Sequence, residues 1–148
     1  MATPPVIHVV NKYKEKEFEY IGRPSPLGNP YHITLLDDRD YVCDMYDLWF
    51  LEHLNDKMVK AELNRLLDIA KSKGKLNLGC YCAPKRCHGE TIARWLNIQL
   101  EEDEEERKYM QQLEDEHIHR ILQKHKVIYQ STPRSGGNNP FEQWWKSE

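Results

Sequence analysis

The segment CYCAPKRCHGE, residues 80 to 90, holds the densest group of reactive side chains in the 148-residue chain. It lies between an alternating apolar stretch, typical of a strand, and a stretch with helical spacing. Ligands of α/β proteins bind beyond the carboxyl ends of strands, where helix N-termini offer free N–H groups to an anion. Lys85 and Arg86 add positive charge, and Gly89 lets a ligand approach the backbone. The segment therefore predicts a phosphate or carboxylate site, with the helix starting at His88.

The same segment also contains a candidate zinc set of three thiols and one imidazole, Cys80, Cys82, Cys87 and His88. Structural zinc sites usually pair their ligands two to four residues apart on a tight turn. Cys80 and Cys82 are instead one residue apart in a predicted strand, where cysteines commonly serve as small core residues. Zinc is thus an alternative to the anion site, and we expect no other cofactor.

Cys87 is the candidate reactive thiol. A position at a helix N-terminus beside Arg86 and His88 lowers a thiol pKa, which favours the nucleophilic thiolate. Adjacent side chains diverge, so the alternative is that Cys87 packs beneath the turn while His88 caps the helix or contacts the ligand. If the protein is an enzyme, His88 is the expected general acid or base. Glu90 is then the nearest carboxylate for glycosidic chemistry.

A second segment, YIGRPSPLGNPY at residues 20 to 31, combines glycines, prolines and polar side chains. Gly22 and Gly28 can take a positive φ, whereas the prolines fix φ elsewhere. Arg23 and Ser25 offer a bidentate donor and a hydroxyl, and Asn29 is biased towards an extended conformation by the proline that follows it. This composition suits either a rigid ligand-binding loop or a stiff connector whose Arg23 forms a surface ion pair.

The two segments, with the spacer between them, resemble a family of phage and bacterial proteins catalogued as domain of unknown function 4326. The resemblance covers about residues 6 to 97. It implies a small Rossmann-like domain that handles nucleotides or nucleosides, and it carries over no reaction. Tyr31 and Tyr81 stand where phenylalanine and tryptophan are common, so both positions keep an aromatic ring. The positions that match the two family signatures are Gly22, Arg23, Ser25, Gly28, Asn29, Cys82, Cys87, His88 and Gly89.

The elements that must position these residues are predicted from hydrophobic periodicity. Residues 5–11 read as a first strand, and residues 12–22 as a second strand or hairpin arm. A helix begins near Asp40, capped by Asp38 or Asp40, and a second helix is capped by Asp56 and ends at Gly74. A strand, predicted to be central, follows at residues 75–82.

The second half of the chain is predicted to be mainly helical. Helical spacing resumes after the cysteine segment and again after the acidic run at residues 101–106, and residues 126–129 read as a last strand. Alternating strands and helices predict an α/β fold, a small layered domain with a mostly parallel sheet and a C-terminal helical extension. We expect one domain over residues 1–130, with a family-like core at 6–97 and the extension at 98–125.

Residues 131–148 form a predicted linker and an aromatic tail. Phe141, Trp144 and Trp145 have the spacing of one face of a helical turn. They predict either docking on another subunit or partner, which would make a homo-oligomer, or folding back on the same domain.

Composition narrows the function. The formal net charge of −3 and the acidic run argue against duplex nucleic acid as a partner. No apolar run approaches the roughly 20 residues that cross a bilayer, and the first residues do not resemble a signal peptide. We expect a cytoplasmic protein, in the host cytoplasm if phage-encoded, with reduced cysteines.

Three functions follow from these observations. The first is binding of a nucleotide or nucleoside phosphate between the two segments, with possible action on its glycosidic or phosphate bond; Arg23 holds the anion, and Ser25 and Asn29 orient the sugar or base. The second is a non-catalytic protein that sequesters a nucleotide signal of host defence. The third is a zinc-stabilised interaction domain.

Overall fold

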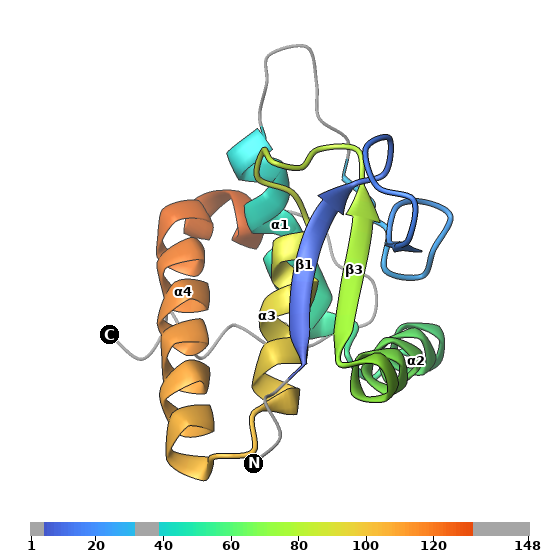
Figure 1. Cartoon of the computed structure of the whole chain (residues 1–148). Helices are drawn as coiled ribbons and strands as arrows, with labels where there is room; N and C mark the ends of the chain where they lie inside the picture. Colours follow the sequence, from blue (N-terminus) through green and yellow to red (C-terminus); the bar gives the residue numbers. More distant parts are fainter. Residues whose placement is uncertain (1–4, 32–38, 132–148) are drawn as a thin grey trace. The chain divides into compact units, whose positions relative to one another are not determined.

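The computed structural model describes residues 5–31 and 39–131, without the side chains of residues 126–131 (Figure 1). The chain divides into two compact units, Met1–Arg107 and Lys108–Glu148. In chain order the elements are β1 (Val6–Asn11), β2 (Glu19–Tyr20), α1 (Arg39–Glu52), α2 (Lys57–Lys73), β3 (Lys75–Cys80), α3 (Gly89–Leu100) and α4 (Glu104–Ser131).

The described strands form a three-stranded parallel sheet in the order β1-β3-β2. Strand β3 is central, as predicted; Val6 pairs with Lys75 at one end of β1, and Asn11 pairs with Cys80 at the other. All three strands therefore end at one edge of the sheet, where the two candidate segments also begin. The predicted α/β class with a parallel sheet and a C-terminal helical segment is confirmed.

Of the two alternatives predicted for residues 12–22, a short second strand is found and a hairpin arm is not. Strand β2 has two residues and pairs with β3 in parallel, with Tyr20 opposite Gly79, rather than with β1. A turn at the end of β1 redirects the chain: the Asn11 side chain accepts a hydrogen bond from Tyr13 N, and the Asn11 carbonyl accepts one from Lys14 N. The charged stretch that follows has too few apolar side chains to sustain a longer strand.

The boundaries of α2 are the predicted ones. The Asp56 carboxylate accepts hydrogen bonds from Met58 N and Val59 N, which satisfies two donors at the start of the helix. Gly74 ends the helix in the left-handed region at φ 73°. For α1, Asp40 lies within the first turn rather than at the cap, and the alternative cap Asp38 lies outside the described residues.

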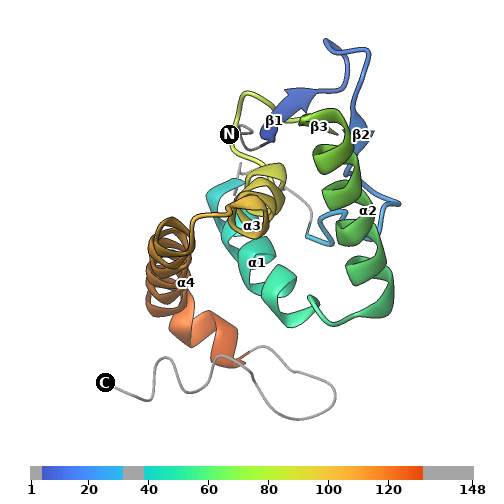
Figure 2. The ribbon, with the colours of Figure 1, turned by 60° about the horizontal axis from the view of Figure 1, so that its bottom comes forward.

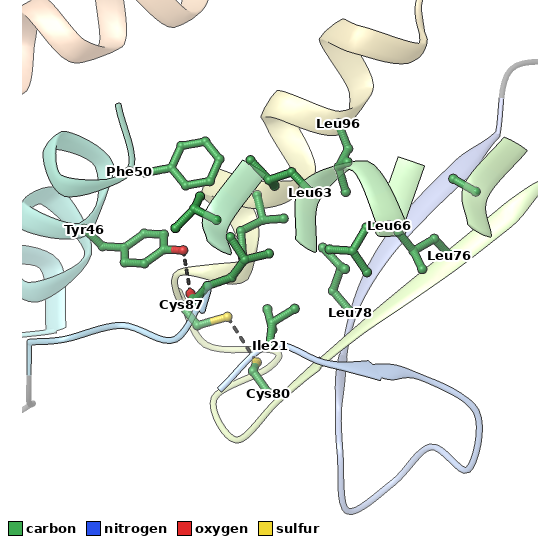
Figure 3. Packing of buried hydrophobic residues seen from close by; sticks show 14 of the residues in the cluster. Ile21, Tyr46, Phe50, Leu63, Leu66, Leu76, Leu78, Cys80, Cys87 and Leu96 are labelled. Carbon is green, nitrogen blue, oxygen red and sulfur yellow. Dashed lines mark hydrogen bonds between the residues drawn. The ribbon is translucent and has the colours of Figure 1, made fainter. Parts of the chain in front are cut away.

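The core lies between the sheet and helices α1, α2 and α3, which Figure 2 shows on the same side of the sheet. Leu76 and Leu78 of β3 point into this layer, as their alternation predicts, and Ile7 and Val9 of β1 pack at its border. Figure 3 shows how the side chains interdigitate. The larger contributions from the helices come from Tyr46, Phe50, Leu63, Leu66, Ile92 and Leu96.

Helix α4 corrects the prediction of a last strand at residues 126–129, because these residues continue the helix to Ser131. His125 departs from helical geometry, with φ −111° and ψ 15°, and marks a kink. A short β-branched stretch gives only a weak preference, which the preceding helix overrides.

The acidic run has a structural role at the start of α4. Asp103 accepts a hydrogen bond from Glu106 N, and Glu104, Glu105 and Glu106 form the first turn, where negative charge is favourable. Over residues 5–31 and 39–131, no helix is both long and apolar enough to span a bilayer. The predicted aromatic anchor, Phe141, Trp144 and Trp145, lies outside the described residues.

Candidate functional site

A cavity of about 410 Å³ opens where the strands end. The loop after β2, the first turns of α1 and the segment between β3 and α3 form its walls. The two segments singled out in the sequence therefore lie at one site. The contribution of α1 was not predicted, since no motif marks it. The side chains and backbone that line the cavity belong to Tyr20, Gly22, Arg23, Asn29, Tyr31, Arg39, Val42, Cys43, Cys80, Tyr81, Cys82, Arg86, Cys87 and His88.

Five predicted ligand or catalytic residues are not among those lining residues, and three of them shape the walls instead. Ser25 accepts a hydrogen bond from Leu27 N at 3.2 Å, which closes a turn of the loop. Glu90 accepts one from Cys87 N at 3.2 Å and so caps the start of α3. A Cβ atom on Gly28 would lie 2.8 Å from Arg23 N, so glycine permits a close backbone approach. The remaining two are Lys85, which is exposed, and Gly89, which is buried.

The predicted positive φ at Gly22 and Gly28 is not found; among the described glycines only Gly74 has it. The loop is rigid for another reason: its backbone is tied to buried side chains. Tyr46 donates a hydrogen bond to the Leu27 carbonyl at 2.6 Å, and Ile21 and Leu27 are fully buried. The loop is therefore anchored in the core at Ile21 and Leu27; Arg23 lies between the two anchors, and Asn29 follows the second.

His88 provides a further anchor. Its Nε2 lies 2.7 Å from the Ile21 carbonyl oxygen. A carbonyl oxygen only accepts, so Nε2 carries the proton and donates it. Burial lowers the pKa of His88, and the edge of Tyr46 packs against the ring at a centroid distance of 5.0 Å. His88 is therefore a neutral imidazole that joins the loop to the start of α3, with Nδ1 as its acceptor nitrogen.

Arg86 is held by carboxylates of α1. Its guanidinium lies 2.8 Å from Asp44, 3.2 Å from Asp40 and 3.6 Å from Asp47. Asp44 and Asp47 are buried, so the charge of Arg86 is largely balanced within the protein. Arg39 donates to the Arg86 carbonyl at 3.2 Å, which fixes the turn against the helix. Arg23 and Arg39 are the other arginines among the described residues that line the cavity.

All four cysteines of the chain line the cavity. The sulfur atoms of Cys80 and Cys87 lie 3.1 Å apart, within hydrogen-bonding distance (Figure 3). The predicted lowering of the Cys87 pKa is wrong: the hydrogen bond with Cys80 and burial raise it. The same hydrogen bond lowers the pKa of Cys80 to about 6. Burial raises the pKa of Cys43 to about 11.

The zinc alternative gains no support from this geometry. Within the described ranges, no group of three or more histidine, cysteine or acidic side chains is arranged to hold a metal ion. In the candidate set itself, Cys80 and Cys87 face each other and His88 faces a backbone carbonyl.

A cluster of Lys12, Tyr20 and Tyr81 borders the cavity and was not predicted. The Lys12 ammonium lies 3.3 Å from the Tyr81 hydroxyl and 4.5 Å from the centre of its ring. The two tyrosine hydroxyls are 3.2 Å apart, and Tyr20 also lies 3.0 Å from the Arg23 carbonyl. Hydrogen bonds from Tyr20 and Lys12 lower the pKa of Tyr81, whereas that of Tyr20 rises to about 12. The only feature of the sequence that could have indicated this cluster is the strand alternation, which directs Tyr81 away from the core.

Comparison with known proteins identifies the family. The model of the family described as Domain of unknown function (DUF4326) matches residues 8–98, which include every residue that lines the cavity. A relative in Enterobacteria phage T4, the uncharacterized 12.4 kDa protein in the nrdA-td intergenic region, is 32% identical over 96 residues. The match covers 64% of this chain and 82% of the phage protein. No solved structure matches the chain. The chain belongs to the family Domain of unknown function (DUF4326).

Proposed function

We propose that the protein binds a nucleotide or nucleoside phosphate in the cavity at the carboxyl edge of its sheet. One observation carries the proposal: three arginines and three tyrosines line the cavity, and no carboxylate belongs to the described residues that line it. These residues are Arg23, Arg39, Arg86, Tyr20, Tyr31 and Tyr81.

The arginines favour a phosphate. A guanidinium group binds phosphate oxygens through two parallel hydrogen bonds, which gives affinity and orientation together. Arg23 and Arg39 approach from the loop and from α1, and helix α3 begins behind the turn at Gly89. The positive end of the α3 dipole lies on the same side. An anion in the cavity would thus meet positive groups from three elements.

The tyrosines favour an aromatic base beside the phosphate. Tyr31 and Tyr81 expose 40% and 53% of their surface, so part of each ring is open to a ligand. Aromatic rings stack on any base through their π faces. A volume of about 410 Å³ lies within the range of pockets that hold small ligands. The Rossmann-like character that the family resemblance implies is consistent with the same ligand class.

The geometry favours binding without turnover over an enzyme. Glu90, the candidate carboxylate, is not a lining residue; it accepts a hydrogen bond from Cys87 N and caps α3. The Nε2–H group of His88 donates a hydrogen bond to the Ile21 carbonyl. The expected carboxylate therefore has a structural role and the one N–H group of His88 is engaged in the fold, which supports the sequestering version.

A nucleotide panel tests the proposal and separates its two versions. The protein is incubated with nucleoside mono-, di- and triphosphates, freed of unbound ligand, denatured and analysed by chromatography. We expect one class to be retained and recovered intact, which indicates a binding protein. Recovery of an altered compound indicates an enzyme, and retention of no compound contradicts the proposal.

The Arg23→Ala variant tests whether the nucleotide binds in this cavity. A charge-assisted hydrogen bond contributes about 1.5–3 kcal/mol, so we expect affinity to fall by about 10- to 150-fold. Arg65→Ala is the matched control, because Arg65 pairs with Glu19 and Glu62 on the surface and is not a lining residue. Calorimetry on both folded variants measures the difference, and equal affinities would return the loop to the role of a connector.

A further inference from the structure

We infer that Cys80 and Cys87 form a redox-active pair, which a hydroperoxide converts into a disulfide in the wall of the cavity. The two sulfur atoms are 3.1 Å apart, and both residues line the cavity. Figure 3 shows the two thiols pointing toward each other, one from the end of β3 and the other from the segment before α3. The cavity gives a small oxidant a route to sulfurs that the rest of the protein covers.

The backbone holds this pair in place. Asn11 donates hydrogen bonds to the Ala83 and Tyr81 carbonyls at 3.0 and 3.3 Å, which fixes the segment just after Cys80. Glu90 accepts a hydrogen bond from Cys87 N and fixes the other side. The contact between the sulfurs is therefore set by the fold, and the pair needs little rearrangement to react.

The surroundings distinguish the roles of the two sulfurs. Cys80 receives hydrogen bonds from the Cys87 thiol and from the backbone at Cys82 and Ala83, which stabilise a thiolate. Cys87 keeps its proton, since burial and contact with Cys80 disfavour its charged form. Redox-sensing cysteines have this arrangement, a stabilised thiolate beside a second thiol that resolves the first oxidation product. Cys80 is therefore the attacking residue and Cys87 the resolving one.

The reaction balances with a hydroperoxide as the sole oxidant. The Cys80 thiolate attacks one peroxide oxygen, the O–O bond breaks, and hydroxide leaves and takes up a proton as water. The sulfur of Cys87 then attacks the Cys80 sulfenic acid, forms the S–S bond and gives up its proton, while the sulfenic oxygen leaves as a second water. Two thiols and one hydrogen peroxide thus yield one disulfide and two waters.

Peptide mapping tests this assignment on the full chain. The native protein is treated with one equivalent of hydrogen peroxide, its remaining thiols are alkylated, and it is digested with trypsin. Cleavage at Lys85 and Arg86 separates the two cysteines, so a disulfide leaves peptides 76–85 and 87–94 joined until a reductant is added. We expect the joined species in the wild type and in Cys82→Ser, which removes the other cysteine of the first peptide.

Single substitutions identify the order of events. Cys80→Ser should abolish the joined species. Cys87→Ser should stop at a sulfenic acid on Cys80 that a 1,3-dione reagent traps. A link that disappears in Cys82→Ser, or both thiols of the wild type remaining fully alkylatable after peroxide, would overturn the assignment. If Cys80→Ser or Cys87→Ser does not fold, peptide mapping of the wild type and of Cys82→Ser is sufficient to test for the disulfide. Neither of these two measurements depends on a bound nucleotide.

Discussion

His88 shows how one residue ties the site to the stability of the fold. Its neutral ring is buried and donates its Nε2 proton to Ile21, and burial lowers its pKa below the ordinary 6.5. As pH falls through about 6.5, the unfolded chain takes up a proton that folded His88 does not yet bind. The stability that neutral His88 contributes is therefore complete above that pH and is lost as pH falls towards the folded pKa.

Replacement of His88 should flatten this pH dependence. We expect the free energy of unfolding of the wild type to fall between pH 7.5 and 5.5, and to fall less steeply in His88→Gln, whose amide can still donate to the Ile21 carbonyl. Most carboxylates titrate below this window and contribute little to the slope. Urea denaturation at several pH values measures both slopes. Parallel slopes would mean that His88 is not the group that titrates.

For single residues, the sequence predicts which side chains lie at the site better than it predicts their chemical roles. Arg23, Asn29 and His88 reach one cavity because the carboxyl ends of parallel strands share an edge, and a strand-end pattern is readable in a sequence. The protonation state of Cys87 cannot be predicted from the sequence in the same way. It depends on a contact with Cys80, seven residues away, and that contact is set by the path of the intervening turn.

Between elements, the main polar contact of the site is Arg86 with helix α1. The guanidinium reaches Asp44 and Asp47, which are 4% and 1% exposed, and so joins the segment before α3 to α1. Removing one member of a buried ion pair leaves the other charge in a poorly solvated place, which costs far more than losing an exposed pair.

Arg86→Ala should therefore destabilise the protein strongly. We expect a loss of about 3 kcal/mol in the free energy of unfolding, moderated because Arg94 also pairs with Asp47 at 2.6 Å. Arg65→Ala, which breaks exposed pairs with Glu19 and Glu62, should cost about 0–1 kcal/mol. Urea denaturation of both variants compares the two. Similar small losses would show that Arg86 is available to a ligand instead of being committed to α1.

The elements that local chemistry defines were predictable. Helix α2 has a capping aspartate, an apolar stripe and a terminal glycine, and all three signals agree. The parallel pairing of β2 and the helical state of residues 126–129 were not predictable, for opposite reasons. The pairing of β2 is decided by a distant partner, β3, and the short β-branched stretch is outweighed by the helix before it.

For the whole molecule, charge is distributed unevenly. The chain carries a formal net charge of −3, yet the described residues that line the cavity include three arginines and no carboxylate. The acidic residues at 104–106 instead start α4, in a segment that contributes no lining residue. The proposed anionic ligand would thus meet local positive charge on a chain of negative net charge, so we expect a nucleotide to bind and a duplex not to bind.

Salt should reveal this local attraction. Raising the ionic strength from 0.1 to 1 M shortens the screening length from about 10 to about 3 Å, which weakens the interaction of Arg23 and Arg39 with phosphate. We expect nucleotide affinity to fall by about tenfold across this range, and duplex DNA not to bind at 0.1 M. Calorimetry with the nucleotide identified from the panel measures the salt dependence of nucleotide affinity. Fluorescence anisotropy of a labelled duplex measures DNA binding. A nucleotide affinity that is independent of salt would show that the tyrosines, rather than the arginines, provide the binding energy. Tight binding of the duplex would contradict the expectation that the negative net charge of the protein excludes extended polyanions.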